Sequence, residues 1–407
     1  MSETATSSEP RIAYVVSQEL VKISSLLPSN KNRSFLVHSL INKLNLLSNS
    51  TSPQELHKIN IISPRRATKD ELCLYHDEEY LDFVLDESHC QSATSDFGIE
   101  DDCPPFSGLH NYIPLVAGAT IAAVDQLVKN LANVAICWDG GRHHAQKTHA
   151  SGFCYVADCI LAILAFKKAP IPAPMGAQRK SRIMYLDLDL HFSDAVTQCF
   201  YNASQSRSMP QVLTLSVHYD SPGFFPPSLY SGFPDPKSEN FDPLSLSLPL
   251  QRGASASTYT RIWHIIEDVQ GAFDPDFVIV QCGVDGLAGD PCGMFNWSID
   301  NREGDMAWCI DQVVNKWNRR TLLLGGGGYN SPNAARAWAH LTSVTRGRRI
   351  PEDTPVPDHS AFPLYSPSFT LDIPKGNMID ENTNDYLKTL TDTYSGIVKQ
   401  IQEIMSA

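Results

Sequence analysis

Four apolar segments of strand length each lead directly into a polar or glycine-rich segment, and this recurrence constrains the fold more than any other feature. The segments cover residues 134–138, 183–191, 277–285 and 321–328. Short runs rich in Val, Ile and Leu are typical of strands that are buried on both faces of a parallel sheet. In such sheets, ligands bind just beyond the carboxyl ends of the strands. The four segments therefore predict one site at one edge of a parallel sheet.

Segments with helical spacing separate these strands along the chain. The pattern predicts helices at 34–47, 112–130, 155–168, 258–273, 305–317, 333–345 and 383–405, and a helix start at 68–71. It predicts further strands at 11–16, 59–62 and 212–218. Irregular or exposed segments are expected at 87–110, 169–181 and 350–378. No break in composition divides this alternation. We expect an α/β fold with one domain at 11–407, a mostly parallel central sheet sandwiched by helices, and a disordered N-terminal tail at 1–10.

Composition excludes several classes of protein. The 407 residues are 42% hydrophobic, enough for a large core, and carry a net charge of −13, which disfavours direct nucleic-acid binding and suits basic peptides. The ten cysteines form no CxxC pair, as in a reduced intracellular protein. We find no signal-peptide pattern and no apolar run approaching the roughly 18 residues of a membrane span. We therefore expect a soluble intracellular protein without membrane contact.

The segment 183–191 carries polar residues within an apolar strand. Asp187, Asp189 and His191 alternate with apolar residues, and a period of two would place them on one face. Two buried carboxylates on one face repel each other unless a cation lies between them. The alternative is a strand end whose acids cap a neighbouring helix, and this segment alone does not decide between the two.

A further carboxylate, Asp285, ends the strand that begins at 277. Asp189, His191 and Asp285 are candidate zinc ligands, because two carboxylates and a neutral imidazole neutralise the ion and leave coordination positions open, as in catalytic sites. The alternative for Asp285 is a turn or helix-cap aspartate.

Two adjacent histidines, His143 and His144, follow the strand at 134–138 and a glycine pair. Either residue could be a surface or core histidine, but a neutral imidazole beside a metal site can act as a general base. Each ring then needs a carboxylate to fix its tautomer, and Asp187 and Asp194 are available.

Tyr329 follows four consecutive glycines at 325–328. A phosphate cradle is poorly supported there, because the run lacks both the Lys-Ser/Thr ending and the GxGxxG spacing. Asn330 can cap the next helix, which would hold the Tyr329 hydroxyl in place to stabilise an oxyanion. An ordinary core tyrosine is the alternative. Phe153 and Phe225 lie in loops, where two opposed rings would form a slot for a slim aliphatic chain.

Taken together, these motifs resemble the class I zinc-dependent histone deacetylases. The matching segments are WDGGRHHA at 138–145, ASGFCYV at 150–156, DLDLH at 187–191, SPGFFP at 221–226, GDP at 289–291 and GGGGYN at 325–330, with 33–40, 75–77 and 356–359 extending the match. The resemblance covers roughly residues 11–400 in order. The N-terminal segment is similar to the human member numbered eight and its fungal relatives.

The resemblance implies the arginase/deacetylase fold and the hydrolysis of acetyl-lysine to lysine and acetate. It implies that Asp189, His191 and Asp285 bind zinc and that a structural potassium ion lies at Asp187, Ser216 and Val217. The implied catalytic groups are the pairs His143–Asp187 and His144–Asp194, with His144 as general base, and Tyr329. The residues implied to bind substrate are Asn111, Gly152, Phe153, Phe225, Cys292 and Gly327. Arg33 would lie beside an inner acetate-exit cavity. Several positions depart from the family: Asn111 stands where a rim Asp is usual, and Arg142 where Leu or Trp is usual. Phe192, Ser193 and Ala195 replace the usual His-Gly-Asp-Gly surroundings of Asp194.

The implied partner is an acetylated protein, either a histone tail or a cohesin subunit, and hydroxamates are expected inhibitors. Nuclear and cytoplasmic residence both remain open, as does the oligomeric state. Three alternatives share parts of the same residue set: a deacetylase of acetylpolyamines or other small molecules, a dinuclear arginase-like hydrolase, and a catalytically weak acetyl-lysine-binding scaffold.

Overall fold

An eight-stranded sheet forms the centre of the molecule in the computed structural model, which describes residues 11–49, 57–172, 177–201, 211–300 and 302–406. The strand order is β2-β1-β3-β10-β9-β6-β7-β8, and every neighbouring pair is parallel. The strands are β1 (Arg11–Val15), β2 (Lys58–Ile62), β3 (Val134–Cys137), β6 (Ile183–Asp187), β7 (Val212–Tyr219), β8 (Ser245–Leu250), β9 (Phe277–Gln281) and β10 (Arg320–Leu324). The predicted fold class is confirmed, whereas the predicted tail at 1–10 lies outside the described residues.

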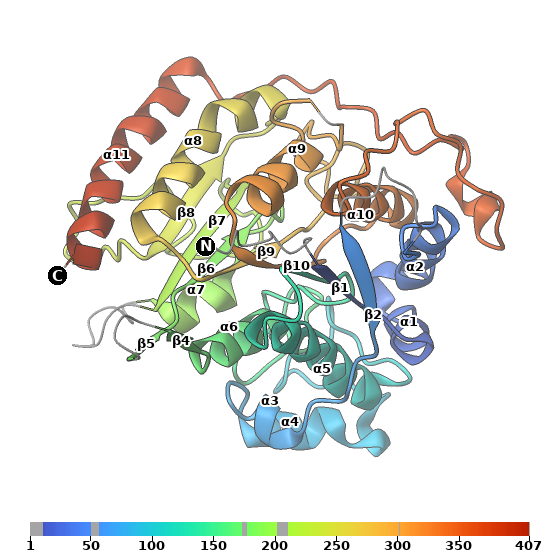
Figure 1. The fold of residues 1–407 in the computed structure, drawn as a ribbon. Helices are drawn as coiled ribbons and strands as arrows, with labels where there is room; N and C mark the ends of the chain where they lie inside the picture. Colours follow the sequence, from blue (N-terminus) through green and yellow to red (C-terminus); the bar gives the residue numbers. More distant parts are fainter. Residues whose placement is uncertain (1–10, 50–56, 173–176, 202–210, 301, 407) are drawn as a thin grey trace, which may run out of the picture.

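Helices cover both faces of this sheet (Figure 1). They are α1 (Gln18–Ser24), α2 (Arg33–Lys43), α3 (Lys69–Leu72), α4 (Glu78–Leu85), α5 (Leu109–Val128), α6 (Asp158–Lys167), α7 (Asp194–Phe200), α8 (Ala256–Phe273), α9 (Met306–Asp311), α10 (Ser331–Thr345) and α11 (Asn384–Ser406). Shorter elements are η1 (Pro28–Asn30), η2 (Glu87–His89), a π turn (Gln312–Lys316), η6 (Phe362–Tyr365) and the antiparallel pair β4 (Pro170–Pro172) and β5 (Gln178–Lys180).

Alternating side chains of each strand feed two separate cores. In β1, Ile12 and Tyr14 belong to the buried cluster that includes apolar residues of α2 and α8–α11, whereas Ala13 and Val15 belong to the cluster that includes those of α4, α5 and α6. Figure 1 shows α8–α11 on one side of the sheet and α3–α6 on the other. Because the strands are apolar on both faces, each layer of helices has a continuous surface to cover.

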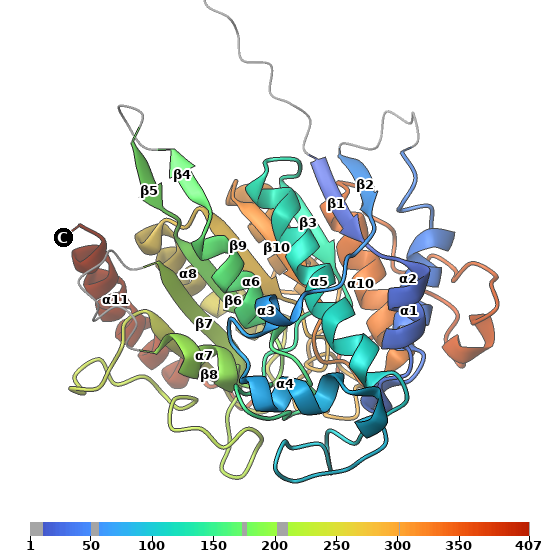
Figure 2. The ribbon, with the colours of Figure 1, turned by 90° about the horizontal axis from the view of Figure 1, so that it is seen from below.

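The parallel direction brings all carboxyl ends of the strands to one edge. The long segments after β7 and before α5 gather at that edge, which is the lower one in Figure 2. The predicted site edge therefore exists, and it is surrounded by loops.

The prediction of one strand from 183 to 191 is wrong in its second half, because β6 ends at Asp187. The carboxylate of Asp187 accepts the backbone N–H of Asp189 at 3.0 Å, and that of Asp189 accepts the N–H of His191 at 3.1 Å. Such side-chain bonds to a backbone N–H two residues on compete with strand pairing. The acidic residues therefore extend from the strand end in two successive turns rather than sharing one face of a strand.

Four elements had no clear sequence signal, namely α1, α4, α7 and β8. The insert at 169–181, expected to be irregular, carries the β4–β5 pair.

The expectation about membrane spans also needs correction. Helix α5 is long and apolar enough to cross a membrane by length and composition, although 72% of that segment is buried inside the molecule. A buried core helix passes the same test.

Candidate metal centre and active site

Four strands that are adjacent in the sheet deliver the predicted site residues. The order β3-β10-β9-β6 places the loops after these strands next to one another. His143 and His144 follow β3, Tyr329 follows β10, Asp285 follows β9, and the segment from Asp187 to Asp194 follows β6. The strand order thus brings together side chains that lie far apart in the sequence.

Three of these side chains converge on a common centre. The Nδ1 atom of His191 lies 2.9 Å from Oδ2 of Asp285 and 3.2 Å from Oδ1 of Asp189. A tetrahedral site with metal–N and metal–O bonds of roughly 2.0–2.1 Å separates its donors by about 3.3–3.4 Å. Both separations are close to the edges of that tetrahedron, so the spacing of His191 from each carboxylate fits a shared zinc ion.

Backbone and amide N–H groups hold the two carboxylates in place. Oδ2 of Asp189 accepts the N–H of Gly327 at 2.8 Å and the side-chain amide of Gln281 at 2.9 Å. Oδ1 of Asp285 accepts the N–H of Leu190 at 3.0 Å. These contacts fix which oxygen of each carboxylate faces the common centre.

The charge of this cluster calls for a cation. Burial and the nearby charge of Asp189 raise the pKa of Asp285 to about 7. Burial alone would lower the pKa of His191, but its hydrogen bonds to Asp189 and Asp285 outweigh burial and raise that pKa well above its usual value, so a positive charge is favoured between the two carboxylates. The chemistry of the donor set therefore fits a divalent ion, consistent with the predicted ligands Asp189, His191 and Asp285.

Two buried histidine–carboxylate pairs lie beside the three donors. Nδ1 of His143 bonds Oδ2 of Asp187 at 2.8 Å, and Nδ1 of His144 bonds Oδ1 of Asp194 at 2.7 Å. The two rings are 3.9 Å apart between centroids. Each Nδ1 is occupied by a carboxylate, and Nε2 of His143 lies 3.8 Å from Oδ1 of Asp189. Among the described residues, Nε2 of His144 has no hydrogen-bond partner, so it is the nitrogen available to a substrate or water.

The two histidines differ in basicity. Burial alone would lower the pKa of His143, but the charges of Asp187 and Asp189 outweigh it and raise the pKa to about 9. Burial and the charge on His143 lower the pKa of His144 below its usual value. His144 is therefore neutral at pH 7 and is the histidine able to accept a proton.

Asp290, which sequence reasoning did not single out as a site residue, fixes the position of Tyr329. Oδ2 of Asp290 accepts the backbone N–H groups of Tyr329 at 2.7 Å and Asn330 at 3.1 Å, and Oδ1 accepts that of Cys292 at 3.0 Å. Burial, followed by the charges of the two acidic donors, raises the pKa of Tyr329 well above its usual value. The hydroxyl therefore keeps its proton. The predicted helix cap at Asn330 is confirmed, because its side chain accepts the N–H of Asn333.

Aromatic rings stand next to both catalytic candidates. The ring of Phe153 lies 5.3 Å from that of Tyr329, and Phe225, 36% exposed, lies 4.9 Å from His144. A Cβ atom on Gly152 would come within 2.5 Å of the His144 ring, so this position requires glycine. The N–H of Gly152 donates to the carboxylate of Asp102 at 2.7 Å. Asp102 therefore lies at the wall of the site that Gly152 forms, and sequence reasoning missed it.

Asn111 has different neighbours. It lies in the first turn of α5, where its side chain bonds Arg66 at 2.9 Å and His110 at 2.6 Å. Among the described residues, no hydrogen bond joins it to the other site candidates. Its substrate-binding role stays a prediction, and Asp102 is the carboxylate that the structure brings to the wall.

The remaining predicted residues lie at or just behind the centre. Cys292 is half-buried in the loop between β9 and α9, near His191 and Asp285. For the potassium site, the register of β6 and β7 pairs Asp187 with Ser216, and Val217 follows in β7.

A small polar cavity lies behind the site. Arg33 and Arg142 both line it, and both are buried. The guanidinium of Arg33 donates to the carbonyl of Gly328 at 2.9 Å, and that of Arg142 to the carbonyl of Asp139 at 3.1 Å. The charge that Arg142 adds is therefore directed at the inner cavity rather than at the metal donors.

Comparison with known proteins gives a consistent result. A family model described as "Histone deacetylase domain" matches residues 27–345. Histone deacetylase 8 of Danio rerio is 32% identical over 414 residues, covering 98% of this chain and 100% of the relative. Histone deacetylase clr6 of Schizosaccharomyces pombe is 32% identical over 93% of this chain and 86% of the relative. Human histone deacetylase 1 is 33% identical over 82% of this chain and 65% of the relative.

Proposed function

Because this chain belongs to the histone deacetylase family, we propose that it is a zinc-dependent hydrolase that removes acetyl groups from lysine side chains of proteins. The observation that carries the proposal is the convergence of Asp189, His191 and Asp285 beside the His144–Asp194 pair. Zinc bound there would act as a Lewis acid on the acetyl carbonyl and lower the pKa of the hydrolytic water.

The protein's own groups supply the proton transfers. His144 is neutral and its Nε2 is free, so it takes the proton of the attacking water and returns it to the leaving lysine nitrogen. Asp194 fixes the tautomer that makes this possible. Tyr329 remains protonated and donates to the carbonyl oxygen as negative charge develops there.

We assign substrate selection to the wall of the site formed by the Phe153 and Phe225 rings, here called the aromatic wall. Phe153 and Phe225 flank Tyr329 and His144, where they would contact the aliphatic part of an acetyl-lysine side chain. Asp102 offers a carboxylate near this wall for N–H groups of the peptide backbone. The net charge of −13 favours basic acetylated segments, such as a histone tail or a cohesin subunit.

We assign the structural potassium site to the β6–β7 junction. Asp187 and Ser216 are direct partners in that register, both are buried, and Val217 supplies a neighbouring carbonyl. An alkali cation there would offset the negative charge of Asp187 behind the His143 ring. We also expect hydroxamates, which chelate zinc, to inhibit the enzyme.

The test is metal-dependent turnover on two substrates. We expect the zinc-loaded protein to hydrolyse an acetyl-lysine peptide, to lose activity after chelation, and to regain it with zinc. A higher kcat/KM for an acetylpolyamine than for the peptide would favour the small-molecule alternative. Peptide binding without turnover in the fully zinc-loaded protein would contradict the proposal and favour a scaffold.

A further inference from the structure

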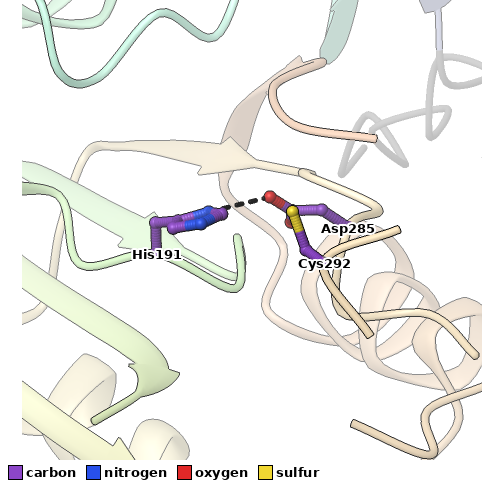
Figure 3. Close-up of side chains that lie close together, drawn as sticks. All are labelled: His191, Asp285 and Cys292. Carbon is purple, nitrogen blue, oxygen red and sulfur yellow. Dashed lines mark hydrogen bonds and ion pairs between the residues drawn. The ribbon is translucent and has the colours of Figure 1, made fainter. Parts of the chain in front are cut away.

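The thiol of Cys292 belongs to the same cluster of potential metal donors as two of the proposed ligands. One donor atom each from His191, Asp285 and Cys292 lie within 4.8 Å of one another. Figure 3 shows the three side chains converging, with the sulfur beside the carboxylate of Asp285. Sulfur is a preferred donor for zinc, alongside imidazole and carboxylate.

The required movement is small. With a zinc–sulfur bond of about 2.3 Å and other bonds of roughly 2.0–2.1 Å, a tetrahedral site separates sulfur from its neighbours by about 3.6 Å. From a separation within 4.8 Å, the sulfur has to approach by no more than about 1.2 Å. Rotation about the single side-chain torsion of cysteine covers that distance, and the bond from its backbone N–H to Asp290 holds the backbone in place.

Exposure places Cys292 on the outer side of the cluster. Asp189 and Asp285 are 1% and 0% exposed, and Asp189 accepts hydrogen bonds from Gly327 and Gln281, whereas Cys292 is half-buried. A donor on the outer side lies where the three inner donors leave the metal open. That is also the side from which a substrate oxygen has to approach.

We propose that Cys292 is a fourth and exchangeable donor for the metal ion held by Asp189, His191 and Asp285, and that it closes the open position when no substrate is bound. With a metal ion present, the sulfur would bind it as a thiolate, its proton passing to solvent, and a substrate oxygen would take that position while the released sulfur regained a proton. This inference rests on the proposed metal site.

Cobalt spectroscopy tests the inference without relying on turnover. The full-length protein is freed of metal and reloaded with one equivalent of Co²⁺, whose visible bands report the site and whose near-ultraviolet thiolate-to-cobalt band reports sulfur. We expect that band in the wild type, its loss in Cys292→Ala, and its retention in Cys90→Ala, which changes another half-buried cysteine. Excess acetohydroxamate should also remove the band from the wild type.

Zinc affinity provides a second readout. Loss of a residue that only hydrogen-bonds to a metal ligand weakens metal binding roughly 10–100-fold. Cys292→Ala removes a direct donor, so it should weaken zinc binding by at least that factor. Stoichiometric cobalt without a thiolate band overturns the role of Cys292 but leaves the metal site intact. A thiolate band that persists in Cys292→Ala overturns it as well. Failure of the wild type to bind cobalt overturns the metal site and the proposed function together.

Discussion

Gly327 lies against both carboxylate donors of the proposed zinc site, so the substitution Gly327→Ala tests that site through geometry alone. A Cβ atom built at this position would be 2.2 Å from Oδ2 of Asp285 and 2.8 Å from Oδ2 of Asp189. Since real Cβ atoms essentially never approach other atoms closer than 3.0 Å, the Asp285 carboxylate has to retreat by about 0.8 Å. No charge is added or removed.

That retreat is large on the scale of metal coordination. Ligand distances in real sites stay within about 0.2 Å of their ideal values, so the shift is roughly four times the tolerance. We expect Gly327→Ala to weaken zinc binding by at least roughly 10–100-fold. That is the effect of losing a residue that hydrogen-bonds to a ligand, and here a ligand itself moves. The measurement is zinc per protein by elemental analysis across a series of chelator concentrations, with kcat measured on the same samples.

A matched glycine provides the control. Gly271 lies in α8, where a Cβ atom would meet no other atom within 4 Å, so Gly271→Ala should keep wild-type zinc affinity. Its helical position should even add up to about 1 kcal/mol of stability. Gly283→Ala repeats the test from the end of β9, where the Cβ would lie 2.0 Å from the carboxylate of Asp189. Wild-type zinc affinity in both Gly327→Ala and Gly283→Ala would refute the ligand assignment.

Three further predictions concern the groups around the donors. Tyr329→Phe should lower kcat by about 10²–10³, the usual effect of losing one oxyanion donor, whereas Tyr386→Phe on α11 should leave kcat unchanged in the same peptide assay. Asp290→Ala removes the acceptor for the Tyr329 backbone N–H. A displacement of the Tyr329 ring by about 1 Å should then lower kcat roughly 10²-fold at unchanged zinc content. An unchanged kcat would mean that other contacts hold the ring. Asp194→Asn removes a charge that raises the pKa of His144, so the acid limb of the kcat/KM profile should move to lower pH, and a shift to higher pH would contradict the role of His144 as base.

The sequence was sufficient to predict seven of the eight strands of the sheet, all except β8, and the edge that carries the site. Runs such as 277–281 are apolar over nearly their whole length, as is typical of strands covered on both faces, and parallel strands end at one edge. Once the edge was known, polar residues after each strand had to meet there. The need of each ring for a carboxylate indicated Asp187 and Asp194 as candidates, and the resemblance to the histone deacetylases implied which histidine pairs with which. Both bonds, His143 with Asp187 and His144 with Asp194, are present.

Residues that act through loop geometry escaped prediction. Asp290 binds a backbone N–H 39 residues away, and Asp102 binds one 50 residues away. Gln281 is the last residue of β9, and nothing in its own segment reveals that its amide reaches Asp189. A strand period or a motif indicates the element on which a residue lies and the chemistry that its side chain can supply. The partner of a single side chain in a loop depends instead on how two loops pack.

The glycine run at 325–328 shows how one sequence feature can combine separate constraints. A Cβ on Gly325 would be 2.0 Å from the carbonyl of Trp138, so this position is set by the close approach of the β3 loop. Gly326 has a φ of 140°, a conformation that other residues rarely adopt. Gly327 makes room for two carboxylates and donates its N–H to one of them. A phosphate cradle would need successive N–H groups directed at one anion. Here the anion is Asp189, a side chain of the protein itself, so the run serves to seat a proposed metal ligand.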